Sequence, residues 1–164
     1  MPTKSFVSFQ LNRQLFGIDI DLVREINRHL DTTPVPHAPD YVRGLINLRG
    51  QIITVLDLKR RLGLAYSENT DSAHNIILKS DSELGHHSEE NTEDDERIPL
   101  TSSDKASFWV DEIGDVLTLD SEEIDAPPAN IGTLDGKYLS GVVKLDKTLM
   151  GILSVSKILN ERLD

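Results

Sequence analysis

The chain lacks cysteine altogether, which excludes disulfide bridges and thiolate metal sites. Aromatic residues make up 5% of its 164 residues and the net charge is −11, so neither a base-stacking surface nor a general phosphate-binding surface is expected. No apolar run approaches the roughly 18 residues of a transmembrane helix, and the first residues lack the apolar core of a signal peptide. We therefore expect a cytoplasmic protein that binds no nucleic acid and does not insert into a membrane.

Motifs of the common enzyme classes are also missing from the sequence. It has no phosphate-binding loop ending in Lys-Ser/Thr, no HExxH and no GxSxG. The carboxylates of Asp111, Glu112 and Asp115 are close in sequence, but alternation along a strand sends Glu112 to the other face, which favours a solvated face over a catalytic group. We expect neither enzymatic activity nor a cofactor.

Charge is distributed unevenly along the chain. Residues 1–66 hold 9 Lys/Arg and 6 Asp/Glu, whereas residues 80–105 hold 2 Lys/Arg and 9 Asp/Glu. The 80–105 segment has few apolar residues and no periodicity, which predicts a disordered acidic insertion. Its neighbouring histidines, His86 and His87, do not form a convincing metal site, because adjacent residues rarely converge on one ion.

The rest of the chain has the pattern of an all-β protein. Short apolar or alternating runs separated by proline and glycine predict strands at 5–11, 15–20, 44–48, 51–58, 74–80, 107–119, 137–145 and 148–155. We expect the long 107–119 strand to bend at Gly114. Residues 21–27 fit either a short helical turn or a continued strand. A helical turn closed by Gly63 follows the 51–58 strand, and a short C-terminal helix is expected at 154–164, with Ser154 or Ser156 as its N-cap.

An internal duplication is visible at an offset of 97 residues. The segment that begins at Tyr41 aligns without a gap with the one that begins at Tyr138, so that Gly44 falls on Gly141. We expect these glycines to mark a bend or a close approach of two backbones. Two units of this size should pack as pseudo-symmetric halves. We place the first half at about 12–66, and the second at about 67–153 together with the N-terminal strand 5–11.

The repeats differ at the turn of the 44–58 hairpin. The first carries Asn47, Arg49 and Gly50, and the second carries lysine or aspartate at these positions. Because Arg49 is surrounded by core-forming residues, its guanidinium should need a carboxylate partner, and Glu25 is the acid expected on a neighbouring strand. The alternative is an arginine at an exposed hairpin tip.

These segments together resemble the CheW-like coupling domains of bacterial chemotaxis. The resemblance rests on 6–20, VREI at 23–26, TPVPHAPDYVRGLINLRGQIITVLDL at 33–58, VDEIGDV at 110–116, the prolines at 127–128 and YLSGVVKL at 138–145. It implies a single domain at 5–164, made of two intertwined five-stranded SH3-like barrels related by a pseudo-two-fold axis. The acidic 80–105 segment, Ser154 in place of an aspartate, and Ala106-Ser107 in place of a glycine depart from the family pattern.

The resemblance also implies a function. CheW-like proteins are non-catalytic adaptors that join the regulatory domain of a CheA-type histidine kinase to the cytoplasmic tips of chemoreceptors, in membrane-associated arrays. Glu25, Asn47, Arg49 and Gly50 match the family pattern in place. With Val23 and Ile26 of the VREI segment, they are the residues that we expect to bind partners. An adaptor of a non-flagellar chemosensory pathway, for surface motility or second-messenger control, is the alternative.

Overall fold

The computed structural model describes residues 2–28, 31–66, 72–80 and 105–160. The acidic insertion predicted at 80–105 falls almost wholly outside these residues. The strands are β1 (Thr3–Leu11), β2 (Gln14–Asp19), β3 (Val23–Asn27), β4 (Val42–Leu48), β5 (Gln51–Asp57), β6 (His74–Leu78), β7 (Ala106–Val110), β8 (Glu112–Asp120), β9 (Ile124–Asp125), β10 (Asn130–Ile131), β11 (Leu134–Asp135), β12 (Leu139–Lys144) and β13 (Leu149–Leu153). The helices are α1 (Leu58–Arg61) and α2 (Val155–Asn160), with 3₁₀ turns η1 (Ile20–Leu22), η3 (Ser121–Glu123) and η4 (Gly136–Tyr138).

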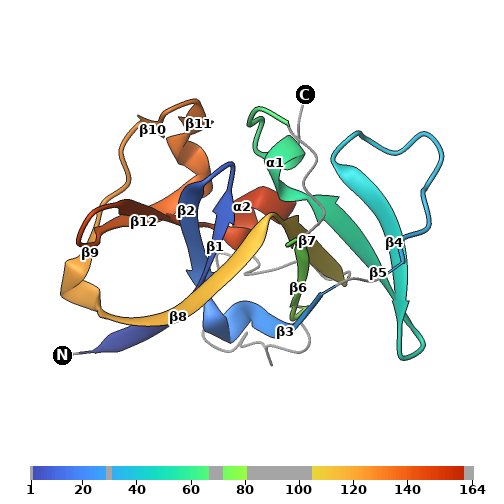
Figure 1. Ribbon diagram of the computed structural model, residues 1–164, viewed down its shortest axis with the longest axis horizontal. Helices are drawn as coiled ribbons and strands as arrows, with labels where there is room; N and C mark the ends of the chain where they lie inside the picture. Colours follow the sequence, from blue (N-terminus) through green and yellow to red (C-terminus); the bar gives the residue numbers. More distant parts are fainter. Residues whose placement is uncertain (1, 29–30, 67–71, 81–104, 161–164) are drawn as a thin grey trace, which may run out of the picture.

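The strands form two barrels that lie side by side (Figure 1). We call the five-stranded sheet β3-β6-β7-β5-β4 the first barrel, and the six-stranded sheet β8-β1-β2-β13-β12-β9 the second barrel. Each has one parallel pair, β5 with β7 and β13 with β2, and its other ladders are antiparallel. The order β3-β6-β7-β5-β4 in the first barrel is repeated by β8-β1-β2-β13-β12 in the second, where β9 is an additional edge strand. This repeated order confirms the predicted duplication.

The two barrels close in equivalent ways. In the first, Thr33 returns to β4 and exchanges two backbone hydrogen bonds of 2.8 Å with Leu45. In the second, Asp125 of β9 pairs with Val142, the residue 97 positions after Leu45. A Cβ on Gly44 would clash with the carbonyl oxygen of Thr33, and β4 also carries a bulge between Val42 and Gly44. The predicted close approach at this glycine is therefore confirmed.

The division of the chain between the barrels differs from the expected one. β2, placed by sequence in the first half, belongs to the second barrel, while β6 and β7, placed in the second half, belong to the first. Each repeat consists of a hairpin, a strand, a second hairpin and a helix: β1-β2, β3, β4-β5 and α1, then β6-β7, β8, β12-β13 and α2. The first hairpin of each repeat packs in the barrel built by the other repeat. The expected boundaries at 12–66 and 67–153 are wrong because the repeats exchange these hairpins.

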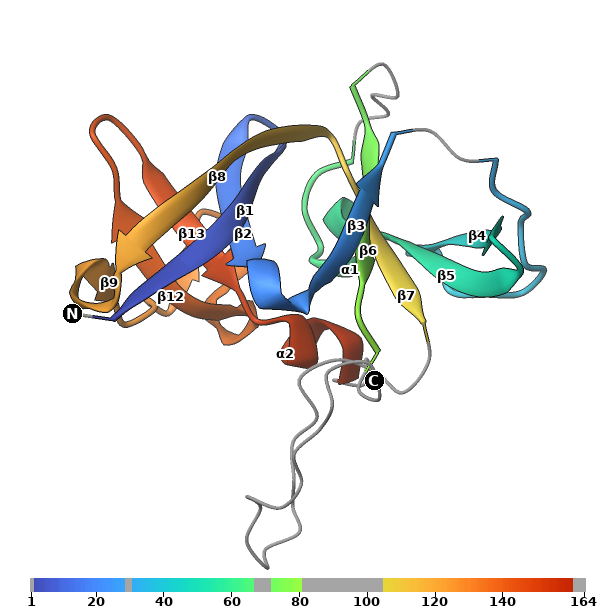
Figure 2. The same ribbon diagram turned by 90° about the horizontal axis from the view of Figure 1, so that it is seen from below.

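The chain crosses between the barrels at η1 and at Asp111. Residues 20–22 form the helical turn and 23–27 the strand, so both expected structures occur, one after the other. The strand expected at 107–119 is divided at Asp111, where β7 ends in one barrel and β8 begins in the other (Figure 2). The bend expected at Gly114 is present as a bulge, because Val7 pairs with Val116 whereas Phe9 pairs with Ile113.

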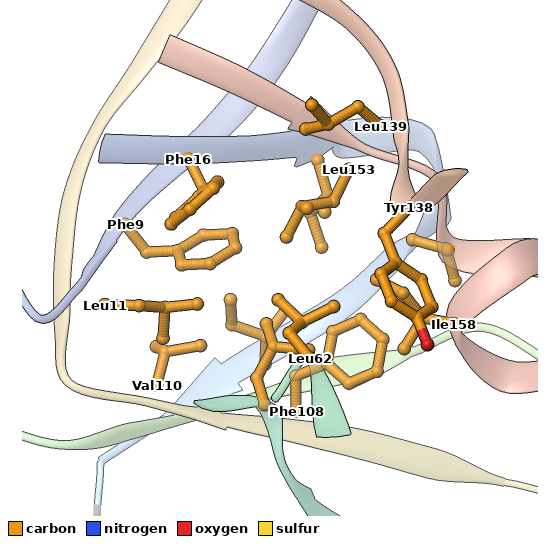
Figure 3. Packing of buried hydrophobic residues seen from close by; sticks show 14 of the residues in the cluster. Phe9, Leu11, Phe16, Leu62, Phe108, Val110, Tyr138, Leu139, Leu153 and Ile158 are labelled. Atoms are coloured by element: carbon orange, nitrogen blue, oxygen red, sulfur yellow. The ribbon is translucent and has the colours of Figure 1, made fainter. Parts of the chain in front are cut away.

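The largest hydrophobic cluster joins the barrels. Figure 3 shows Phe9, Phe16 and Leu153 of the second barrel packed toward Phe108 of the first, with Ile158 of α2 alongside. The Ser154 hydroxyl accepts a hydrogen bond from the backbone N–H of Lys157 at 3.4 Å, so Ser154 is the N-cap of α2. Residues 161–164 of the predicted helix lie outside the described part. No helix among the described residues is long and apolar enough to cross a membrane.

Candidate partner-binding surface

The turn between β4 and β5 positions Arg49. Leu48 pairs with Gln51, which leaves Arg49 and Gly50 as a two-residue turn with φ angles of 51° and 85°. Two successive positive φ angles are typical of the type I′ turns that match the twist of a β-hairpin. The side-chain oxygen of Asn47 accepts a hydrogen bond from the Gly50 N–H at 3.0 Å. Asn47 and Gly50 therefore hold the turn in shape, and Arg49 extends from it.

Arg49 forms an ion pair with Glu25 of β3. Nearby, the Arg24 guanidinium donates a hydrogen bond of 2.9 Å to the side-chain oxygen of Gln51. A bulge between Val23 and Glu25 places both Arg24 and Glu25 in reach of the hairpin. These contacts link β3, one edge of the five-stranded sheet, to the hairpin at its other edge, and they confirm the predicted Glu25–Arg49 pairing.

The Glu25–Arg49 pair lies at the surface, and its Arg49 side is largely solvated. The Arg49 side chain is 63% exposed and that of Glu25 is 23% exposed. Water screens such a pair, so its contribution to folding is about 0–1 kcal/mol. Both alternatives considered for Arg49 are thus partly correct, because the side chain has its carboxylate partner and also lies at an exposed hairpin tip.

Val23 and Ile26 are placed differently from the rest of the expected site. Both are half-buried and pack against the core that joins the barrels, so they anchor β3 more than they face a partner.

Ile52 is 56% exposed at the start of β5, next to the Arg49 turn, and sequence reasoning missed it. The sequence did contain a signal for this exposure, because side chains alternate between the two faces of a strand and the next residue, Ile53, is a core residue. Leu149, the counterpart of Ile52 in the second repeat, is 38% exposed.

Asp57 is buried at the end of β5. Its carboxylate accepts a hydrogen bond of 3.3 Å from the Arg60 N–H and caps α1, while the Arg43 guanidinium lies 3.6 Å away and stacks 3.7 Å above the Trp109 ring. Burial raises the pKa of Asp57, against the opposing effects of the α1 N–H and the nearby cations. Sequence reasoning did not identify this cluster, because its members come from β4, β5 and β7.

Asp111 is also buried, which overturns the expectation of a solvated acidic face. Its carboxylate accepts a hydrogen bond from the Asn12 N–H at 2.9 Å and lies 2.9 Å from the Lys59 ammonium. Glu112 and Asp115 are exposed, as expected. Asp111 differs from them because it occupies the crossing between the barrels, where α1 and the β1-β2 turn converge on it.

Within the ranges that the structure describes, no three His, Asp or Glu side chains gather as a metal site. The His86-His87 pair lies outside those ranges.

Comparison with known proteins agrees with this geometry. The CheW-like domain model matches residues 5–163. The chain is 31% identical over 156 residues to the chemotaxis protein CheW of Treponema pallidum, covering 95% of this chain and 82% of the relative. It is 29% identical over 155 residues to the chemotaxis protein CheW of Thermotoga maritima, covering 94% and 87%.

A solved structure extends the similarity to the fold. The crystal structure of the scaffolding protein TtCheW from Thermoanaerobacter tengcongensis matches with a TM-score of 0.77 at 29% identity, over 99% of this chain and 97% of that one. The predicted fold class, two intertwined SH3-like barrels, is thereby confirmed. The chain belongs to the family of CheW-like domains.

Proposed function

We propose that the chain is a non-catalytic adaptor of a bacterial chemosensory system. It links the regulatory domain of a CheA-type histidine kinase to the cytoplasmic tips of chemoreceptors, in arrays beneath the membrane. The observation that carries this proposal is the agreement with chemotaxis CheW proteins over nearly the whole chain, in sequence and in fold.

The two-barrel architecture supports an adaptor role because it provides two related but unequal faces. The β4-β5 hairpin presents Ile52 beside the Glu25–Arg49 pair, and the β12-β13 hairpin presents Leu149 at the equivalent position. Residues 106–136 contain eight Asp/Glu and no Lys/Arg, whereas residues 1–66 carry a net positive charge. Exposed apolar residues beside charges of opposite sign favour contacts with different partners, steered by electrostatic complementarity.

In this proposal, Glu25 and Arg49 shape the receptor-facing surface, and Asn47 and Gly50 fix the turn that presents Arg49. Val23 and Ile26 hold β3 in place beneath it. The exposed pair contributes little to stability, so its value lies in orientation and in the specificity of the encounter.

The proposal is tested by reconstitution. The purified chain, a CheA-type kinase and vesicles carrying a receptor cytoplasmic fragment are mixed, and kinase co-sedimentation and autophosphorylation are measured. We expect the chain to increase both at least tenfold over kinase and receptor alone. Ile52→Asp and Leu149→Asp are matched variants that should each reduce the assembly through a different barrel. If the chain binds neither the kinase nor the receptor fragment, the proposal is wrong.

A further inference from the structure

The second barrel contains a mostly apolar cleft of about 240 Å³ beside the N-terminus of α2. Apolar side chains from β1, β13, η1 and β9 line it: Phe6, Ile152, Leu22 and Ile124. This volume is below the roughly 300–1,000 Å³ of small-molecule sites, and suits one or two side chains better than a cofactor.

The duplication shows what occupies the equivalent place in the first barrel. At the offset of 97 residues, Ser140 and Ser154, which both line the cleft, correspond to Arg43 and Asp57. Ser156, also at the cleft, corresponds to Lys59 in the same way.

The fourth correspondence follows from strand register. In the first barrel, Asp57 of β5 lies beside Trp109 of the parallel strand β7. In the second, Ile152 of β13 lies beside Gly17 of β2, and extending that register by two residues brings Ser154 beside Asp19. Asp19, which lines the cleft, therefore stands where the first barrel has Trp109.

The first barrel fills this place with its own side chains. The Trp109 ring is buried, and the Arg43 guanidinium lies 3.7 Å above it and 3.6 Å from the Asp57 carboxylate. A guanidinium over an aromatic face is attracted by the ring's quadrupole, and the carboxylate adds a charge partner. In the second barrel, shorter side chains stand at all four positions, and the same place is a cleft.

The surroundings of the cleft are acidic. Ile124 lies between Glu123 and Asp125, and no Lys or Arg occurs from residue 106 to residue 136. An incoming cation would therefore meet a favourable field. Lys4 and Asp19 both line the cleft and form an ion pair of 2.8 Å, in which the Lys4 side chain is 56% exposed, so an incoming cation would compete with the Lys4 ammonium for the Asp19 carboxylate.

We propose that this cleft is a docking site for a segment of a partner protein that inserts an aromatic side chain carrying an arginine or lysine beside it. The partner's two side chains take the place that Trp109 and Arg43 occupy in the first barrel. This goes beyond the adaptor role, since it assigns a third contact surface to the chain and does not depend on kinase or receptor binding.

The test uses the full chain and the capped dipeptide acetyl-Arg-Trp-amide, titrated while ¹H–¹⁵N spectra are recorded. We expect saturable shifts centred on Ser140, Ile152 and Ser154, and at least tenfold weaker binding of acetyl-Arg-Ala-amide and acetyl-Glu-Trp-amide. Shifts centred elsewhere, equal binding of the three dipeptides, or no binding would overturn the proposal.

A set of variants locates the site independently. Asp19→Trp, Ser140→Arg and Ser154→Asp combined recreate the cluster of the first barrel, and should abolish dipeptide binding without lowering the unfolding midpoint. Should that triple variant not fold, Ser140→Leu alone fills part of the cleft and should weaken binding at least fivefold. Thr118→Leu, at an exposed position of the same sheet that does not line the cleft, is the matched control. Equal effects of Ser140→Leu and Thr118→Leu would contradict the proposal.

Discussion

The ammonium group of Lys59 lies 2.9 Å from the carboxylate of Asp111, and both side chains are at least nine-tenths buried. Lys59 belongs to α1 of the first repeat, and Asp111 is the residue at which the second repeat crosses from one barrel to the other. The same carboxylate accepts the N–H of Asn12, from the β1-β2 turn. One buried ion pair thus connects three segments that are far apart in sequence.

Removing one partner of this pair should be strongly destabilising. Lys59→Met leaves a buried carboxylate without its cation, which costs about 3–5 kcal/mol. The double variant Lys59→Met with Asp111→Asn removes both charges and keeps an oxygen that accepts the Asn12 N–H, so it should recover much of the loss. Urea unfolding followed by tryptophan fluorescence measures both. A loss below about 1 kcal/mol for the single variant would show that the pair is not energetically coupled to folding.

Two glycines on the β4-β5 hairpin should respond very differently to a methyl group. Gly44 has a φ of +145°, and its added Cβ would clash with the Thr33 carbonyl that closes the first barrel. Gly50 has a φ of +85°, but its added Cβ would meet no atom within 4 Å. Gly50→Ala should therefore cost about 1 kcal/mol from backbone strain, and Gly44→Ala more than about 3 kcal/mol. Comparable unfolding midpoints for the two variants would contradict this account of barrel closure.

The raised pKa of Asp57 predicts a pH-dependent effect of its neutralisation. Because burial disfavours the ionised form in the folded state, the folded chain holds this proton more tightly than the unfolded chain. The wild type therefore bears an unfavourable contribution at neutral pH, which diminishes as the pH falls toward the folded-state pKa. Asp57→Asn removes that contribution and retains an N-cap for α1.

Denaturant unfolding at neutral and at mildly acidic pH checks this prediction. The stability of Asp57→Asn relative to wild type should be higher at neutral pH and should decline on acidification. Asp40→Asn, which neutralises a carboxylate that is 76% exposed, is the control and should show little change. A relative stability of Asp57→Asn that rises on acidification would show the sign to be wrong.

The Glu25–Arg49 pair should matter for partner binding more than for folding. Arg49→Asp should lower stability by less than about 1 kcal/mol, because the pair lies at the surface. It should weaken receptor coupling more than kinase binding. Glu25→Arg combined with Arg49→Glu should restore part of the coupling, with an interaction energy on the order of 1 kcal/mol. A double-mutant cycle on receptor binding measures this, and strictly additive single effects would mean that the two residues act independently.

The sequence by itself determined the local structure and the duplication. Alternation of apolar residues defined the strands, and the offset of 97 residues correctly matched β4-β5-α1 with β12-β13-α2. Glu25 was correctly identified as the partner of Arg49 because the short VREI strand offered a carboxylate, although the Arg49 guanidinium is exposed and not enclosed by core residues. These inferences succeed because they depend on spacing and on pairs of residue types.

The tertiary structure alone decided which barrel each hairpin enters and which charges are buried. Each barrel receives a hairpin at the same place in its strand order, so the alternation of apolar residues along a hairpin does not show which barrel it enters. Short crossings, at η1 and at the single residue Asp111, send β3 and β8 into the opposite barrel. Lys59 and Asp111 resemble solvated charges in the sequence, and they are buried because elements 52 residues apart converge at that crossing.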